Sequence, residues 1–221
     1  MLQHLFPYRF EILLSSQLAI LFGGLLFPAA WFDAYISPVL FILNLLAAVL
    51  LFSKNKMKMW FIVLLLLVAV IALGIDVSET EHVKTTNNVK LTSLFLFYVL
   101  LATELIRQVW SAKKVGKNVI FGLISGYLSI GLIGFFICLS IELYQPGAFQ
   151  GLIYIDGSPT LISEDLIYYS YITLMTIGYG EIVPIVPLAK KAAVLIGLLG
   201  QFYLVILTAV IVGKYINQKN K

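Results

Sequence analysis

Six long apolar segments constrain the fold of this chain more than any other feature. They are residues 12–32, 36–52, 58–75, 91–110, 119–143 and 189–214. A helix needs about 20 apolar residues to cross the hydrocarbon core of a bilayer. Only 12% of the 221 residues are charged, whereas a soluble domain carries about 25%. The sequence therefore predicts an all-α membrane protein with six transmembrane helices.

The basic residues predict the orientation of these helices, because Lys and Arg concentrate in the cytoplasmic loops of membrane proteins. Eleven of the 15 basic residues fall on one side of the predicted topology. These are Arg9, Lys54, Lys56, Lys58, Arg107, Lys113, Lys114, Lys117, Lys214, Lys219 and Lys221. We expect a multi-pass protein of the cell membrane with both termini in the cytoplasm and no cleaved signal peptide. The net charge of +4 comes from these loops, so nucleic-acid binding is not expected.

A basic linker, residues 111–118, divides the chain into two predicted units. Residues 1–110 form a four-helix membrane domain, and residues 119–214 form two helices joined by a segment that returns into the membrane. Residues 215–221 form a cytoplasmic tail. In the outer loop, residues 144–164, turn signals such as Pro146-Gly147 and Asp156-Gly157 predict a small hairpin.

A short apolar patch precedes an irregular stretch of sequence. Residues 165–175 predict a helix that Ser163 caps, and at about 1.5 Å per residue it crosses only about half of the bilayer. Its carboxyl end, with a partial negative charge, would favour a cation at the bilayer centre. The next residues read TIGYG, 176–180. Irregular backbone at this depth must contact protein or water, and glycine reaches positive φ without a Cβ penalty. Four such segments around one axis would give rings of carbonyl oxygens that replace a cation's water shell.

The TIGYG run resembles the T-V-G-Y-G signature of potassium channels, with Ile in place of Val. Residues 200–213, GQFYLVILTAVIVG, resemble the inner helix of small bacterial potassium channels, and residues 141–149, IELYQPGAF, resemble the end of their outer helix. The resemblance covers 119–214 and implies a homotetrameric pore domain with an outer helix, a re-entrant pore helix at 165–175, a selectivity filter at 176–180 and an inner helix. Residues 1–110 agree only in helix count, and resemble a voltage-sensor fold without its charges.

The resemblance also implies roles for individual residues. The carbonyl oxygens of Thr176, Ile177, Gly178 and Tyr179, with the Thr176 hydroxyl, would bind K⁺, and Gly180 would complete the filter. Potassium is then the permeant ion and no other cofactor is implied. Membrane lipid and further copies of the chain are the expected partners.

Three groups are expected to support the filter. Tyr168 and Tyr169 occupy the place of the family's paired tryptophans, and Glu181 that of an acid that is more often Asp. We expect Glu181 to accept a hydrogen bond from Tyr168; alternatively, it is a solvated acid that attracts cations. Glu142 is expected to tie the outer helix to the pore region, or else to be exposed at the interface.

Small and polar residues mark the inner helix. Gly200 occupies the family's hinge position, where glycine eases bending, and Gly197 lies on nearly the same face. The alternative for Gly200 is close helix packing. Thr208 lies on roughly the same face and is expected to line the cavity, whereas Gln201 should face protein or water.

The fourth apolar segment carries too few charges for voltage sensing. It has one cation, Arg107, and one acid, Glu104, whereas a steep sensor needs about 3–4 gating charges per subunit. Their spacing lets the two pair across one helical turn. The sequence therefore predicts weak or absent voltage gating.

Three alternatives to a potassium channel remain at this point. One is a less selective cation channel, which the complete TIGYG run argues against. Another is a nonconducting subunit that modulates other channels. An intramembrane enzyme is disfavoured, because His4 and His82 lie outside the apolar core and Cys138 is expected to be a buried thiol without a catalytic partner.

Overall fold

A computed structural model of the chain describes residues 5–27, 32–53, 56–75, 83–112, 114–153 and 159–219. These residues are almost entirely helical. The long helices are α2 (Arg9–Phe22), α4 (Ser37–Phe52), α5 (Lys56–Ile75), α6 (Val83–Ser111), α7 (Lys117–Tyr144), α8 (Pro159–Leu174), α9 (Pro187–Phe202) and α10 (Thr208–Lys219). Short helical segments are η1 (Phe6–Tyr8), η2 (Gly23–Leu25) and the π-helical η3 (Phe32–Ile36) and η4 (Tyr203–Leu207). Two strands, β1 (Phe149–Gln150) and β2 (Val183–Pro184), pair antiparallel.

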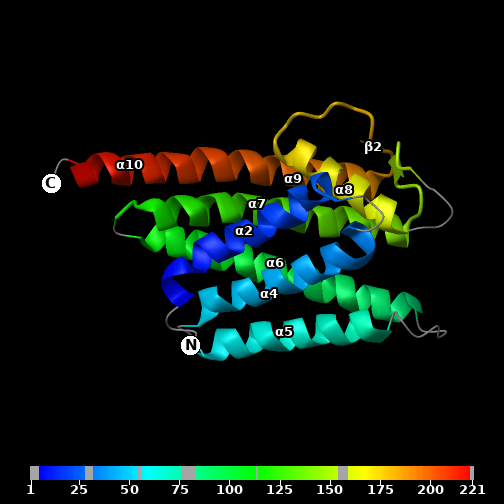
Figure 1. Cartoon of the computed structure of the whole chain (residues 1–221). Helices are drawn as coiled ribbons and strands as arrows, with labels where there is room; N and C mark the ends of the chain where they lie inside the picture. Colours follow the sequence, from blue (N-terminus) through cyan, green and yellow to red (C-terminus); the bar gives the residue numbers. More distant parts are fainter. Residues whose placement is uncertain are drawn as a thin grey trace.

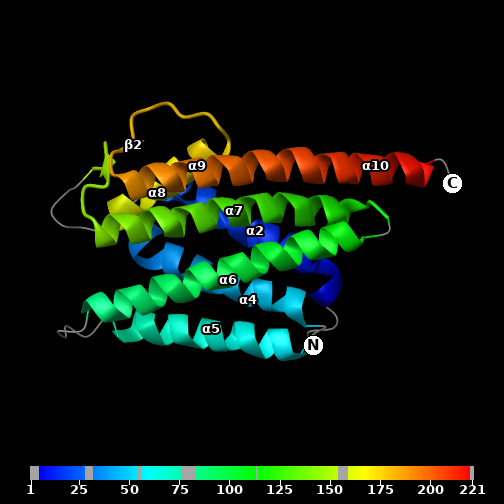
Figure 2. The ribbon, with the colours of Figure 1, turned by 180° about the vertical axis from the view of Figure 1, so that it is seen from behind.

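The helices lie side by side in a bundle, with α5 at one edge and α8, α9 and α10 at the opposite edge (Figures 1 and 2). Between these edges, α7 packs against α2, α6, α8 and α9. The segments α9, η4 and α10 form one continuous rod, so the predicted inner helix extends at both ends beyond 189–214. The first four long helices and the last part of the chain therefore meet mainly along α7.

Three helices within the described residues have the length and apolarity to cross a membrane: Leu91–Ser111, Lys117–Tyr144 and Pro187–Gln218. Two shorter apolar helices, Val39–Phe52 and Met57–Val68, coincide with the predicted spans 36–52 and 58–75. A membrane location follows from these helices, and the predicted number of six crossings stays a prediction.

The prediction that residues 12–32 form a single helix is wrong. Helix α2 ends at Phe22 and is followed by the 3₁₀ turn η2. The cause is the Gly23-Gly24 pair, because glycine is a poor helix former. A Cβ atom at Gly23 would lie 2.6 Å from the Phe32 ring, so the glycine also permits Phe32 to pack against this turn.

Two expectations about the outer loop also need correction. Helix α8 begins at Pro159, so Ser163 lies inside the helix rather than at its cap; proline is favoured in a first helical turn. Contrary to the prediction, strand β1 does not form a hairpin within 144–164. It pairs instead with β2, which follows the TIGYG segment in the sequence. The turn at Pro146-Gly147 is present, with Gly147 at φ 83°, and Asp156-Gly157 lies outside the described residues.

One end of the bundle gathers basic side chains from several helices. Arg9 donates to Gln108 at 3.1 Å, Lys117 lies 3.5 Å from Glu11, and Lys214 donates to the carbonyls of Trp110 and Ala112. We call this the basic end; it holds the starts of α2 and α7 and the ends of α6 and α10. The opposite end carries β1, β2 and the TIGYG segment. This arrangement agrees with a topology in which both chain ends share one side of the membrane.

The interior of the bundle combines aromatic packing with paired polar groups. Tyr98 is fully buried, stacks on Phe136 with ring centroids 5.5 Å apart, and donates to Asn44 at 2.8 Å. The buried Gln17 amide donates to the Ser129 hydroxyl at 2.8 Å. Because an unpaired polar group costs several kcal/mol in hydrocarbon, these bonds allow α2, α4, α6 and α7 to pack with polar residues inside.

Candidate functional site

The backbone of residues 176–180 alternates in the sign of φ. Thr176, Gly178 and Gly180 have φ of 58°, 57° and 94°, and among the described non-glycine residues only Thr176 has a positive φ. Alternating left- and right-handed residues turn successive peptide groups so that their N–H groups share one side, which leaves the carbonyl oxygens on the other. Glycines at two of the three positive-φ positions make this conformation accessible.

Thr176 carries backbone strain. A positive φ is a genuine outlier for a β-branched residue, and such strain costs about 1–3 kcal/mol and concentrates at functional sites. The carboxyl end of α8 holds the strained residue in place. The N–H groups of Met175, Thr176 and Ile177 donate to carbonyls in the last turns of α8, at 2.9, 3.0 and 2.8 Å. The N–H groups of the first loop residues therefore point back to the helix.

The loop lies open on the surface of the single chain. The side chain of Tyr179 is 73% exposed and that of Ile177 is 45% exposed. A Cβ atom at Gly178 or Gly180 would meet no other atom within 4 Å. The glycines are thus required by their φ angles and not by crowding within the chain, and the carbonyls of 176–179 are free to contact a ligand or another copy.

Two tyrosines of α8 contact different partners. The Tyr168 hydroxyl faces the Glu181 carboxylate, which is its main electrostatic partner, and the hydrogen bond expected between them stays a prediction. Tyr169 is buried and packs edge-on against Phe149 of β1, with ring centroids 5.1 Å apart. The pair therefore contacts the exit of the TIGYG segment at Glu181 and the strand β1 that supports it.

Glu142, in the last turn of α7, is buried at 3% exposure. One carboxylate oxygen accepts from the Gly147 N–H at 2.5 Å and the other from the Phe149 N–H at 3.1 Å. Phe149 pairs in turn with Pro184 of β2, and the Ala148 carbonyl accepts from the Ile185 N–H at 2.9 Å. Glu142 thus connects α7 to the residues that follow the TIGYG segment, which agrees with one of the two expectations. The alternative, that Glu142 is exposed at the membrane interface, is wrong.

The inner helix contacts the same region from the other side. Gln201 donates from its amide to the Thr176 hydroxyl at 3.3 Å. Gly200 is buried against the end of α8, where an added Cβ would overlap the Leu174 carbonyl. At Gly197 an added Cβ would lie 3.9 Å from the Thr173 carbonyl. Close packing is therefore visible at Gly200, and the hinge stays a prediction. Thr208 is exposed and begins α10 directly after the π-helical η4.

Sequence reasoning missed a set of hydroxyl groups that fix α8 and η4 to α7. Ser170 donates to the Gly131 carbonyl and Tyr171 to the Leu128 carbonyl, both at 2.7 Å. Tyr203 donates to the Leu123 carbonyl at 2.5 Å. Small residues on α7 admit these side chains, because a Cβ at Gly131 or Gly134 would overlap them. The glycines spaced along an apolar helix were the available signal.

A second omission is Gly151, which has φ 96° and lies against the Glu181 carbonyl. A Cβ atom there would overlap that oxygen. Cys138 is buried, and within the described ranges there is no group of three or more His, Cys, Asp or Glu side chains that could hold a metal ion.

A comparison with protein families gives a separate indication of function. The sequence model of a family described as an ion channel matches residues 147–217, which include β1, α8, the TIGYG segment and most of the inner rod. No curated protein and no solved structure matches the chain. The match supports an ion channel in the part of the chain that contains the alternating backbone.

Proposed function

We propose that this protein is a potassium-selective channel in which four copies of the chain surround one pore. The observation that carries the proposal is the alternation of φ at Thr176, Gly178 and Gly180. Such alternation favours carbonyl oxygens that point to one side, and rings of such oxygens can replace the hydration shell of K⁺. The carbonyls of Thr176, Ile177, Gly178 and Tyr179 are the proposed ligands, with the Thr176 hydroxyl at the inner end.

The need for several copies follows from the geometry of one chain. A single loop supplies one row of oxygens on an exposed surface, and a ring around an ion requires further rows. The inner rod, Pro187–Gln218, offers a surface for neighbouring copies and lipid, because only 22% of its most apolar stretch is buried within the chain. Leu198, Phe202 and Val205 are 47%, 58% and 66% exposed. The number four comes from the family that the TIGYG run resembles.

The end of α8 adds an electrostatic contribution. The carboxyl terminus of a helix carries about half a negative charge, and in this chain it lies directly before Thr176. A cation near the inner end of the loop would therefore be stabilised. Gly180 and Glu181, with the expected hydrogen bond from Tyr168, are proposed to hold the outer end of the filter.

Reversal potentials of the purified, reconstituted protein in mixed K⁺ and Na⁺ salts test the proposal. We expect the wild-type reversal potential to follow the K⁺ gradient. Gly178→Asp should abolish this selectivity, since a side chain at a φ of 57° is strained and its carboxylate would be added beside the proposed carbonyl ligands. Gly116→Asp is the matched control, because Gly116 is the N-cap of α7 with open space around it and Asp is a favoured N-cap.

Three outcomes would contradict the proposal. Equal permeability of K⁺ and Na⁺ in the wild type would favour a less selective cation channel. A folded protein that passes no current would favour a modulatory subunit. A purified assembly with fewer than four copies would exclude the ring of carbonyl oxygens.

A further inference from the structure

A recess of about 300 Å³ opens at the basic end, far from the TIGYG segment. It lies between the start of α2, the end of α4, the start of α5 and the end of α6. Phe6, Leu51 and Phe52 supply apolar walls, and three cations, Arg9, Lys58 and Arg107, reach it together with one carboxylate. The described lining therefore has an excess of two positive charges.

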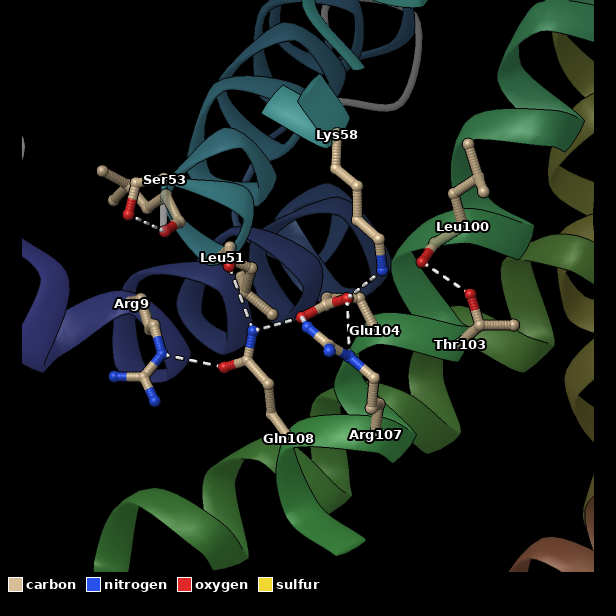
Figure 3. A network of polar contacts seen from close by, with 10 residues as sticks. Arg9, Leu51, Ser53, Lys58, Leu100, Thr103, Glu104, Arg107 and Gln108 are labelled. Atoms are coloured by element: carbon tan, nitrogen blue, oxygen red, sulfur yellow. Dashed lines mark hydrogen bonds and ion pairs between the residues drawn. The ribbon is translucent and has the colours of Figure 1, made fainter. Parts of the chain in front are cut away.

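Glu104 holds two of the three cations in place (Figure 3). Its buried carboxylate accepts two hydrogen bonds from Arg107, at 2.6 and 3.1 Å, and one from Lys58 at 3.2 Å. Gln108 donates to the same carboxylate at 3.0 Å. The carboxylate is thus fully engaged with donors, and it positions Arg107 and Lys58, which remain 61% and 43% exposed.

Arg9 is fixed by a different set of contacts. Its Nε donates to Gln108 at 3.1 Å and one terminal nitrogen donates to the Phe6 carbonyl at 2.9 Å. The guanidinium lies over the Phe6 ring, 4.0 Å from its centroid. Within the described residues these bonds use two of the five N–H groups of a guanidinium. The others are available to an anion, and the guanidinium matches phosphate oxygens in pairs.

We propose that this recess binds the phosphate group of an anionic phospholipid, with Arg9 as its main contact. Basic pockets between transmembrane helices bind the headgroups of such lipids. The apolar walls beside the cations favour a lipid over free phosphate, because they fit the glycerol and acyl portion and offer inorganic phosphate nothing. The bound lipid would join α2, α4, α5 and α6 at one point. The proposal is independent of ion conduction, because its test measures binding.

The test uses the purified full-length chain in a zwitterionic detergent, titrated with phosphatidylglycerol, phosphatidylcholine or sodium phosphate. The unfolding temperature and the lipid retained in native mass spectrometry are the readouts. We expect phosphatidylglycerol to bind about 25-fold more tightly than phosphatidylcholine, since each of the two excess positive charges contributes roughly fivefold to the binding of anionic lipid. Arg9→Gln should reduce this preference to about fivefold.

Two further variants separate the recess from diffuse charge and from loss of folding. Lys114→Gln removes one positive charge from an exposed residue of the 111–118 linker and should keep the preference. Ser111→Phe retains every charge but fills the recess, since Ser111 belongs to its lining, and should abolish the preference. Equal binding of the two lipids, equal losses in Arg9→Gln and Lys114→Gln, or stabilisation by phosphate that matches phosphatidylglycerol would overturn the proposal.

Discussion

Gly151 lies so close to the main-chain carbonyl of Glu181 that a single Cβ atom at residue 151 would overlap that oxygen. Gly151 follows β1 and Glu181 follows the TIGYG segment, so this contact sets the distance between residue 151 and the end of the TIGYG segment. It also explains why a glycine occurs directly after β1, where its φ of 96° is unfavourable for other residues.

We predict that Gly151→Ala destabilises the protein more than Gly147→Ala. Both positions have positive φ, which costs a non-glycine residue about 1–2 kcal/mol. Only residue 151 is also crowded, because Gly147 has open space around it. Overpacking should add about 1–3 kcal/mol. Chemical unfolding in detergent micelles measures the difference, and equal losses for the two variants would show that the contact with Glu181 is unimportant.

Glu142→Gln should lower the free energy of unfolding by about 2 kcal/mol. The substitution replaces one of two buried acceptors by a donor, which then faces an N–H group of Gly147 or Phe149. Glu11→Gln is the control, because it breaks only an ion pair with the exposed Lys117 and should cost less than about 1 kcal/mol. The same unfolding experiment compares them; a Glu142 variant as stable as the Glu11 variant would refute a structural role for this carboxylate.

Tyr168→Phe should speed the slow decay of current during sustained opening. The variant loses the hydroxyl that faces Glu181 and keeps the ring. Tyr169→Phe also removes one hydroxyl, but the ring stays packed against Phe149 and the effect should be smaller. Currents from reconstituted channels under a constant potassium gradient give the decay rates. Identical rates in the wild type and Tyr168→Phe would mean that the Tyr168 hydroxyl does not support the proposed filter.

Gly200→Ala and Gly197→Ala should have opposite effects on the free energy of unfolding, although both glycines lie in α9. The added methyl group overlaps the Leu174 carbonyl at residue 200 but makes an ordinary contact, 3.9 Å from the Thr173 carbonyl, at residue 197. We expect a loss of about 1–3 kcal/mol for Gly200→Ala and a gain of up to about 1 kcal/mol for Gly197→Ala. Unfolding and open probability are measured together. Unchanged stability with reduced opening in Gly200→Ala would favour the hinge instead.

The conductance should change little with voltage. Arg107 is the single cation in the carboxyl half of α6. The expected pair with Glu104 is confirmed by two hydrogen bonds, and the Glu104 carboxylate also accepts hydrogen bonds from Lys58 and Gln108. One cation held near a membrane boundary moves little charge, whereas steep gating needs about 3–4 charges per subunit. Currents recorded over a wide voltage range test this. A conductance that rises steeply within tens of millivolts would contradict it.

The sequence predicted the helices that are uninterrupted apolar runs. Helix α7 and the inner rod contain the predicted spans 119–143 and 189–214. The prediction of a single helix at 12–32 is wrong because the hydropathy of the segment gives no sign of the break at Gly23-Gly24. Likewise, the sequence predicts a helix start capped by Ser163, although α8 begins at Pro159. Local signals of similar strength compete at helix starts, and tertiary contacts decide between them.

The candidate site was predictable where its chemistry depends on backbone conformation. The glycines at 178 and 180 indicated positive φ, and both have it. The positive φ of Thr176 could not be inferred from propensity, since β-branched residues avoid it. The pairing of β1 with β2 has no local pattern, because two-residue strands separated by α8 meet only after the chain folds. The hydrogen bonds of Ser170 and Tyr171 depend on the same docking of α8 against α7.

The position of α7 has a consequence for how the two parts of the chain are connected. This helix packs against α2 and α6 as well as α8 and α9, and it receives the hydroxyl hydrogen bonds at the carbonyls of Leu123, Leu128 and Gly131. A displacement of the edge helix α5 is therefore relayed to α8 and α9 through α6 and then α7, because α5 packs against α4 and α6. Substitutions on the glycine face of α7 should weaken this connection, because a Cβ atom at Gly131 or Gly134 would displace the side chains of Tyr171 and Ser170.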